Sequence, residues 1–83
     1  MKIIFSKHAL EQMEERGAAR SEVSEAITAG EKVLAKKGRV GFRLNFQYNE
    51  RWAGKQYRVK QVMPVVVEEK GCYVVVTVYV FYF

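Results

Sequence analysis

The only histidine of the chain, His8, lies in the segment FSKHALEQMEERG, two residues after Ser6 and eight before Arg16. Because an imidazole titrates near neutral pH, it is the side chain that most readily takes or gives a proton in catalysis. His8 is therefore a candidate general base or acid. The alternative is a half-exposed histidine that packs against a neighbouring sheet.

Positive charge is concentrated in the second half of the sequence. The chain has 14 Lys and Arg residues against 9 Asp and Glu residues, which gives a net charge of +5. Residues 38–83 carry most of this excess. Such an excess suits a polyanionic partner such as RNA, although a similar charge also serves solubility.

Three cations of this half, Arg43, Arg58 and Lys60, would share the polar face of a regular hairpin. Tyr73 or Tyr79 would join them from the last strand. Since cations contact phosphates and aromatic rings stack on bases, this face is a candidate surface for single-stranded RNA. The alternative is a solvated face whose charges limit aggregation at a sheet edge.

The sequence contains no motif for a metal ion or a nucleotide cofactor. It has no Asp, one Cys and one His, and it lacks zinc-ligand spacing, a glycine-rich phosphate loop and a GxSxG turn. We therefore expect neither a metal nor a cofactor. Cys72 has no partner for an intrachain disulfide and no leader is recognisable, which favours the cytoplasm. The longest apolar run, residues 72–83, is too short for a membrane-spanning helix, so we expect no membrane association.

Two helices are predicted in the first part of the chain. Residues 2–5 form a short apolar run typical of a strand, and Ser6 is a suitable N-cap for a helix that ends at Gly17. A second helix is predicted from the N-cap Ser21 to Gly30, and residues 31–38 are predicted to connect it to the sheet.

From residue 39 onward the apolar period changes from 3.6 to 2, which predicts strands. A strand over residues 39–49 is followed by a return strand over 56–69, which bends at Pro64, and by a last strand over 72–83. The predicted order is β-α-α-β-β-β. We expect a single α+β domain over residues 1–83, with a two-helix layer packed on a twisted antiparallel sheet. The core expected from the apolar periods is Leu10, Met13, Val23, Ile27, Val40, Phe42, Leu44, Val59, Val76 and Val78.

The last strand is apolar on both faces. Strict alternation places Val74, Val76, Val78 and Val80 on one face and Tyr73, Val75, Tyr79 and Phe81 on the other. Two helices can cover only one face of the sheet, so the second face needs a partner chain, a second copy or a ligand. A single hairpin neighbour would also leave one edge of this strand free to pair, so we expect a homodimer formed through the C-terminal strand.

The segment FSKHALEQMEERGAARSEVSEAI and the late VVVTVY resemble the DUF4258 domains, small bacterial proteins related to the RelE/ParE-like toxins. This resemblance implies a fold that many toxins use to cut messenger RNA without a metal ion. It implies His8 as the base or acid and Arg16 as a catalytic cation. In this interpretation Arg43, Arg58 and Lys60 contact phosphates and Tyr79 stacks on a base.

Two functions follow from these observations. The first is a RelE-like toxin or metal-independent ribonuclease that a small antitoxin neutralises. The second is a catalytically silent domain that binds itself or another protein through its C-terminal strand.

Overall fold

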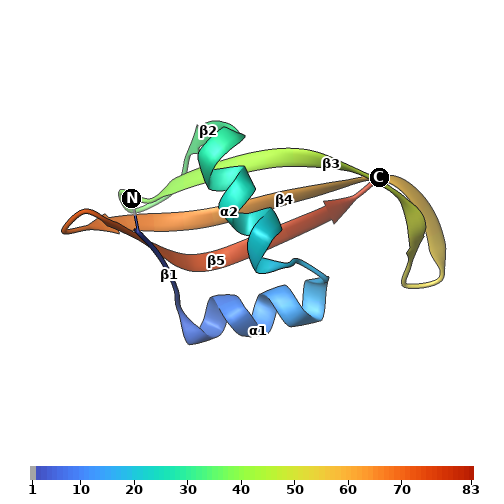
Figure 1. Ribbon diagram of the computed structural model, residues 1–83, viewed down its shortest axis with the longest axis horizontal. Coiled ribbons are helices and arrows are strands. Elements are labelled where there is room, and N and C mark those ends of the chain that lie inside the picture. The colour runs from blue at the N-terminus through green and yellow to red at the C-terminus, as the bar shows by residue number, and fades with distance from the viewer. Residues whose placement is uncertain (1) are drawn as a thin grey trace.

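A computed structural model describes residues 2–83 of the chain. Over these residues the elements are β1 (Lys2–Phe5), α1 (Lys7–Arg16), α2 (Arg20–Ala29), β2 (Glu31–Leu34), β3 (Val40–Trp52), β4 (Lys55–Glu69) and β5 (Cys72–Tyr82). The strands form one sheet in the order β1-β5-β4-β3-β2 (Figure 1). The prediction of an α+β domain with two helices on a sheet is confirmed.

The sheet differs from the prediction in two respects. It is mixed, because β1 pairs parallel to β5 while the other neighbours pair antiparallel. It also contains β2, which was predicted to be part of a connection and instead pairs with the start of β3. A four-residue strand at a sheet edge makes few contacts and leaves little periodicity to detect.

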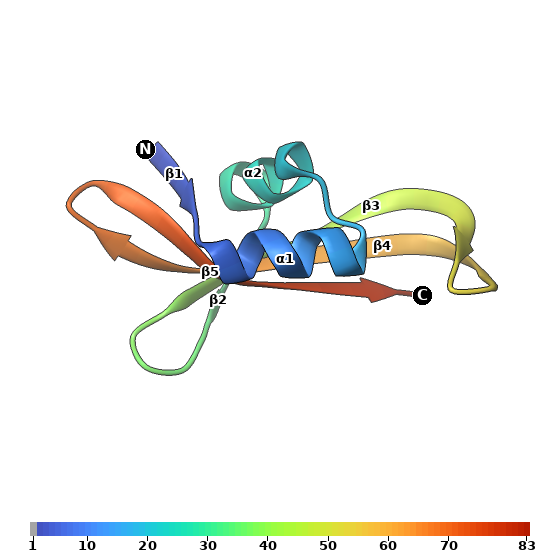
Figure 2. The ribbon, with the colours of Figure 1, turned by 90° about the horizontal axis from the view of Figure 1, so that it is seen from below.

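The helices leave one face of the sheet uncovered. In Figure 1, α1 runs beside β5 and α2 crosses β3 and β4. Figure 2 shows the loop between β2 and β3 projecting to the side of the sheet away from α2. The helix-free face is therefore open to a ligand or partner.

The core lies between the helices and the sheet. It is formed by Ala9, Met13, Val23, Ile27, Phe42, Val62, Val66, Val75 and Val78. The prediction is confirmed for Met13, Val23, Ile27, Phe42 and Val78, and Leu10 and Val40 pack against this core. Leu44, Val59 and Val76 were also expected there but are not among the buried core residues. None of the helices within residues 2–83 is long and apolar enough to cross a membrane.

The ends of α1 follow the prediction, whereas α2 begins earlier than expected. Ser6 Oγ accepts a hydrogen bond from the Ala9 N–H at 3.0 Å, and Gly17 ends α1 with a φ of 80°. The N-cap of α2 is Ala19 rather than Ser21. The reason is that the Glu22 carboxylate accepts from the Ala19 N–H at 2.9 Å, which satisfies the helix start without a side chain at the cap.

β4 runs on through Pro64, although its pairing with β3 is interrupted there. The paired residues pass from Gly41–Val65 directly to Leu44–Val62. Because proline has no N–H to donate, the gap in the ladder falls where the sequence predicted a disturbance.

A register shift in β5 changes which of its residues face the helices. Val65 pairs with Thr77 whereas Val66 pairs with Val75, so Val76 is an extra residue in β5. After this bulge the alternation is reversed. Tyr73, Val75, Val78 and Val80 pack on the core, and Tyr79 lies on the helix-free face. The predicted grouping of Val74 and Val76 with Val78 and Val80 was therefore wrong.

Candidate nucleic-acid interface

The end of β5 and the residue that follows it present exposed aromatic rings. Tyr79, Phe81 and Phe83 are 41%, 45% and 57% exposed. The rings of Tyr79 and Phe81 are nearly parallel, with an interplanar angle of 15° and centroids 6.3 Å apart. Exposed rings on a sheet are platforms on which bases of single-stranded RNA can stack.

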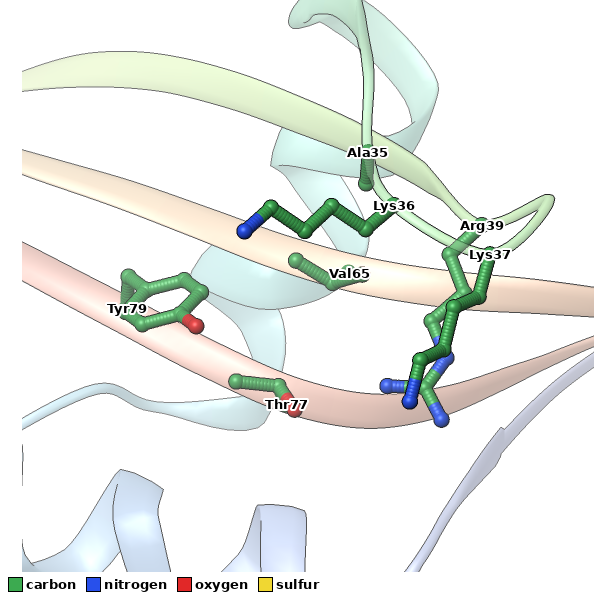
Figure 3. A pocket seen from close by; sticks show the side chains of 7 residues that line it. All are labelled: Ala35, Lys36, Lys37, Arg39, Val65, Thr77 and Tyr79. Atoms are coloured by element: carbon green, nitrogen blue, oxygen red, sulfur yellow. The ribbon is translucent and has the colours of Figure 1, made fainter.

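The loop between β2 and β3 folds over this surface and forms a pocket with it. The pocket has a volume of about 420 Å³ and is lined by Ala35, Lys36, Lys37, Arg39, Val65, Thr77 and Tyr79. In Figure 3 the Lys36 side chain extends towards Tyr79, and those of Lys37 and Arg39 extend towards Thr77. We call this the loop pocket. Its lining contains three cations and no acidic residue.

Arg16 approaches Tyr79 from α1. Its Nη1 donates a hydrogen bond of 2.7 Å to the backbone oxygen of Val78, and its guanidinium carbon lies 5.7 Å from the centroid of the Tyr79 ring. A guanidinium has five N–H donors, so this bond orients the group and leaves further donors for a phosphate. The structure thus brings together two residues that the sequence singled out separately.

Gln12 and Arg16 together cover the edge of β5. Gln12 is buried, and its Oε1 accepts a hydrogen bond of 2.8 Å from the Val78 N–H. Both backbone groups of Val78 are therefore bonded to side chains of α1, at a point where none of the strands within residues 2–83 pairs with this edge. The free edge on which we based self-association is partly closed by α1 and β1, and the dimer itself stays a prediction.

Replacing Gln12 with leucine should lower the free energy of unfolding by about 1–3 kcal/mol, because the buried Val78 N–H loses its acceptor. Urea denaturation of the variant beside Glu11→Leu checks this, since Glu11 is exposed on the same helix. Equal stability of the two variants would mean that α1 does not cover the β5 edge.

His8 is exposed in the first turn of α1, one helical turn before Gln12. Residues four positions apart lie on the same side of a helix, so His8 continues the row formed by Gln12 and Arg16 along β5. His8 therefore lies on the side of α1 that runs along β5, the strand that carries Tyr79. Its role in proton transfer stays a prediction.

The three cations predicted to share a polar face do not share one. Lys60 is 6% exposed and lies on the helix side of β4, where its Nζ donates to Glu22 Oε1 at 2.8 Å and to the Gly17 backbone oxygen. Arg43 follows the core residue Phe42, points to the opposite face and pairs with Glu31. Arg58 is exposed on β4.

The reason for this separation is the irregular hairpin register, which shifts between Gln47 and Glu50. Lys60, moreover, occupies a core-facing position despite its charge. Because its ammonium is already paired and buried, we do not assign it to the interface.

Tyr82 joins the C-terminal strand to the end of α1. Its hydroxyl donates to the Arg16 backbone oxygen at 2.7 Å, and its ring stacks on Trp52 with centroids 4.9 Å apart. Burial, with smaller contributions from Tyr48 and Glu22, raises the pKa of Tyr82 to about 12. The phenol is therefore a neutral donor at physiological pH and has a structural role.

The loop cations Lys36, Lys37 and Arg39 and the hydroxyl of Thr77 were not identified from the sequence. The signal that could have found them is the run KKGR, which places three cations around a glycine. Within residues 2–83, no cluster of three or more His, Cys, Asp or Glu side chains is placed to hold a metal ion.

The fold and this surface define a small α+β domain with a basic, aromatic sheet face. The chain belongs to the DUF4258 family, a domain of unknown function, whose family model matches residues 5–80. The resemblance to this family that the sequence suggested is thereby confirmed. Neither a curated protein nor a solved structure matches the chain significantly.

Proposed function

We propose that this protein binds single-stranded RNA on the helix-free face of its sheet and cleaves it as a RelE-like, metal-independent ribonuclease that an antitoxin neutralises. The observation that supports binding is the position of Tyr79. This exposed ring lines the loop pocket with three cations and also lies beside the Arg16 guanidinium.

The chemistry of this surface matches the two repeating parts of an RNA strand. Arg16, Lys36, Lys37 and Arg39 offer positive charge to phosphates, and Tyr79 and Phe81 offer flat apolar surface to bases. Recognition of this kind depends on the RNA backbone and on the stacking of bases on aromatic rings, so we expect weak preference for RNA sequence.

The expected result is RNA binding that is steeply salt-dependent and requires the loop. The slope of log affinity against log salt should decrease by about 0.7 for each phosphate that the loop cations neutralise. At low salt the variant Lys36→Gln/Lys37→Gln/Arg39→Gln should bind at least about tenfold more weakly, because charge-assisted hydrogen bonds are lost. Fluorescence anisotropy with a labelled oligoribonucleotide measures both quantities.

The matched control is Lys32→Gln/Arg51→Gln/Lys55→Gln, which removes the same charge from exposed positions outside the loop pocket. If both triple variants weaken binding equally, the attraction is only a matter of net charge and the proposed surface is wrong. If the unmodified protein neither retains RNA at low salt nor slows growth on expression, the silent interaction domain replaces the RNA hypothesis.

A further inference from the structure

The loop pocket concentrates more positive charge than one phosphate of an RNA backbone requires. Three cations line it together with the hydroxyls of Thr77 and Tyr79. A phosphodiester carries one negative charge, whereas a terminal phosphate monoester carries close to two at neutral pH. On the basis of the proposed function, we propose that the loop pocket binds the terminal phosphate monoester of an RNA strand.

The backbone of the loop places its three cations at neighbouring positions around one sharp turn. The Ala35 N–H donates to the Arg39 oxygen at 3.2 Å, and the Arg39 N–H donates to the Lys36 oxygen at 3.3 Å. Lys37 and Gly38 adopt positive φ values of 60° and 71°, which turns the chain sharply. The three side chains line one pocket, and their combined charge attracts a dianion more strongly than a monoanion.

The floor of the pocket is suited to a nucleotide rather than to a bare ion. Thr77 and Tyr79 are neighbours on the same face of β5, and both line the pocket (Figure 3). A phosphate can accept from the Thr77 hydroxyl and the loop cations while the adjoining base lies on the Tyr79 ring. A pocket of about 420 Å³ is within the range of small-ligand sites.

The test compares one oligoribonucleotide sequence carrying a 5′-phosphate, a 3′-phosphate or hydroxyl groups at both ends. At least one phosphorylated form should bind about tenfold or more tightly than the hydroxyl form. This advantage should disappear in Lys36→Gln/Lys37→Gln/Arg39→Gln and persist in Lys32→Gln/Arg51→Gln/Lys55→Gln. The two phosphorylated forms show which end of the strand the pocket takes.

A second measurement separates this inference from the proposed function. Adenosine 5′-monophosphate, adenosine 3′-monophosphate and adenosine are titrated while the amide resonances of Thr77 and Arg39 are followed by NMR. If the RNA with hydroxyl groups at both ends binds as tightly as both phosphorylated forms, the terminal-phosphate inference is overturned and RNA binding stands. If a mononucleotide shifts these resonances but RNA is not retained, RNA binding fails and the phosphate pocket stands. If neither ligand binds, both fail.

Discussion

Replacement of Lys60 by methionine should lower the free energy of unfolding by about 3 kcal/mol, because it breaks a buried ion pair and leaves one partner behind. The Lys60 side chain is 8% exposed and that of Glu22 is 23% exposed. Since water still reaches the carboxylate, we expect the lower end of the range for broken buried pairs. Urea denaturation measures this change, with a check that the slope of the free energy of unfolding against urea concentration is the same in the variant and the unmodified protein.

The size of the expected effect follows from what Lys60 connects. Its ammonium binds the Gly17 oxygen at the end of α1, the Glu22 carboxylate at the start of α2 and the face of Tyr48, whose ring centroid is 5.8 Å away. Glu22 in turn accepts from the Ala19 N–H. One side chain of β4 therefore fixes the connection between the two helices.

The control for this experiment is Arg58→Met, two residues earlier on the same strand. Arg58 is exposed, so its replacement should change stability by no more than about 0.5 kcal/mol. If Lys60→Met is as stable as Arg58→Met, the Lys60 side chain reaches solvent. A phosphate-binding role for Lys60 would then be open again.

The predicted and observed positions of Lys60 show what strand periodicity can and cannot predict. Alternation correctly placed Phe42 in the core, because its neighbours on β3 are small or polar. The same rule counted Lys60 with the solvent-facing cations, since its charge was taken to define the polar face. Its partner Glu22 lies 38 residues away in the sequence, and no local pattern connects the two.

The assignment of β5 side chains to the two faces of the strand was wrong for a different reason. The run VVVTV is apolar at nearly every position, so an extra residue at Val76 leaves no visible break in its pattern. The bulge decides that Tyr79 faces away from the core, and it thereby creates the aromatic part of the candidate interface. Only the pairing with β4 reveals it.

Of the candidate site, the residues on α1 and the ring on β5 could be anticipated, whereas the loop could not. Tyr79 was singled out for its ring, and Arg16 was implied by the family resemblance. Lys36 and Lys37 were treated as part of a connection and Arg39 as the start of a strand, because β2, which pairs with the start of β3 on the other side of this loop, was not recognised. Their place in one pocket with Thr77 depends on the loop projecting from the helix-free side of the sheet (Figure 2).

If the protein is a ribonuclease, His8→Ala should reduce the rate of RNA cleavage by about 10²- to 10⁴-fold, the usual contribution of a general acid or base. RNA binding should remain nearly unchanged, because a proton-transfer group acts mainly in the transition state. His8 is exposed, so the substitution should cost little stability. Cleavage is followed on gels with and without ribosomes, and binding is followed by anisotropy on the same RNA.

Lys7→Ala is the matched control, since Lys7 is the exposed residue immediately before His8 in α1. The variant Lys36→Gln/Lys37→Gln/Arg39→Gln should show the opposite pattern to His8→Ala. It should weaken RNA binding, and its cleavage rate should fall only as far as the weaker binding accounts for. A growth defect caused by the unmodified protein should be relieved by His8→Ala and by a co-expressed antitoxin. Cleavage that survives in His8→Ala would remove the histidine from the mechanism. RNA binding without any cleavage by the unmodified protein would instead mean that the fold serves recognition alone, with the proton-transfer step absent.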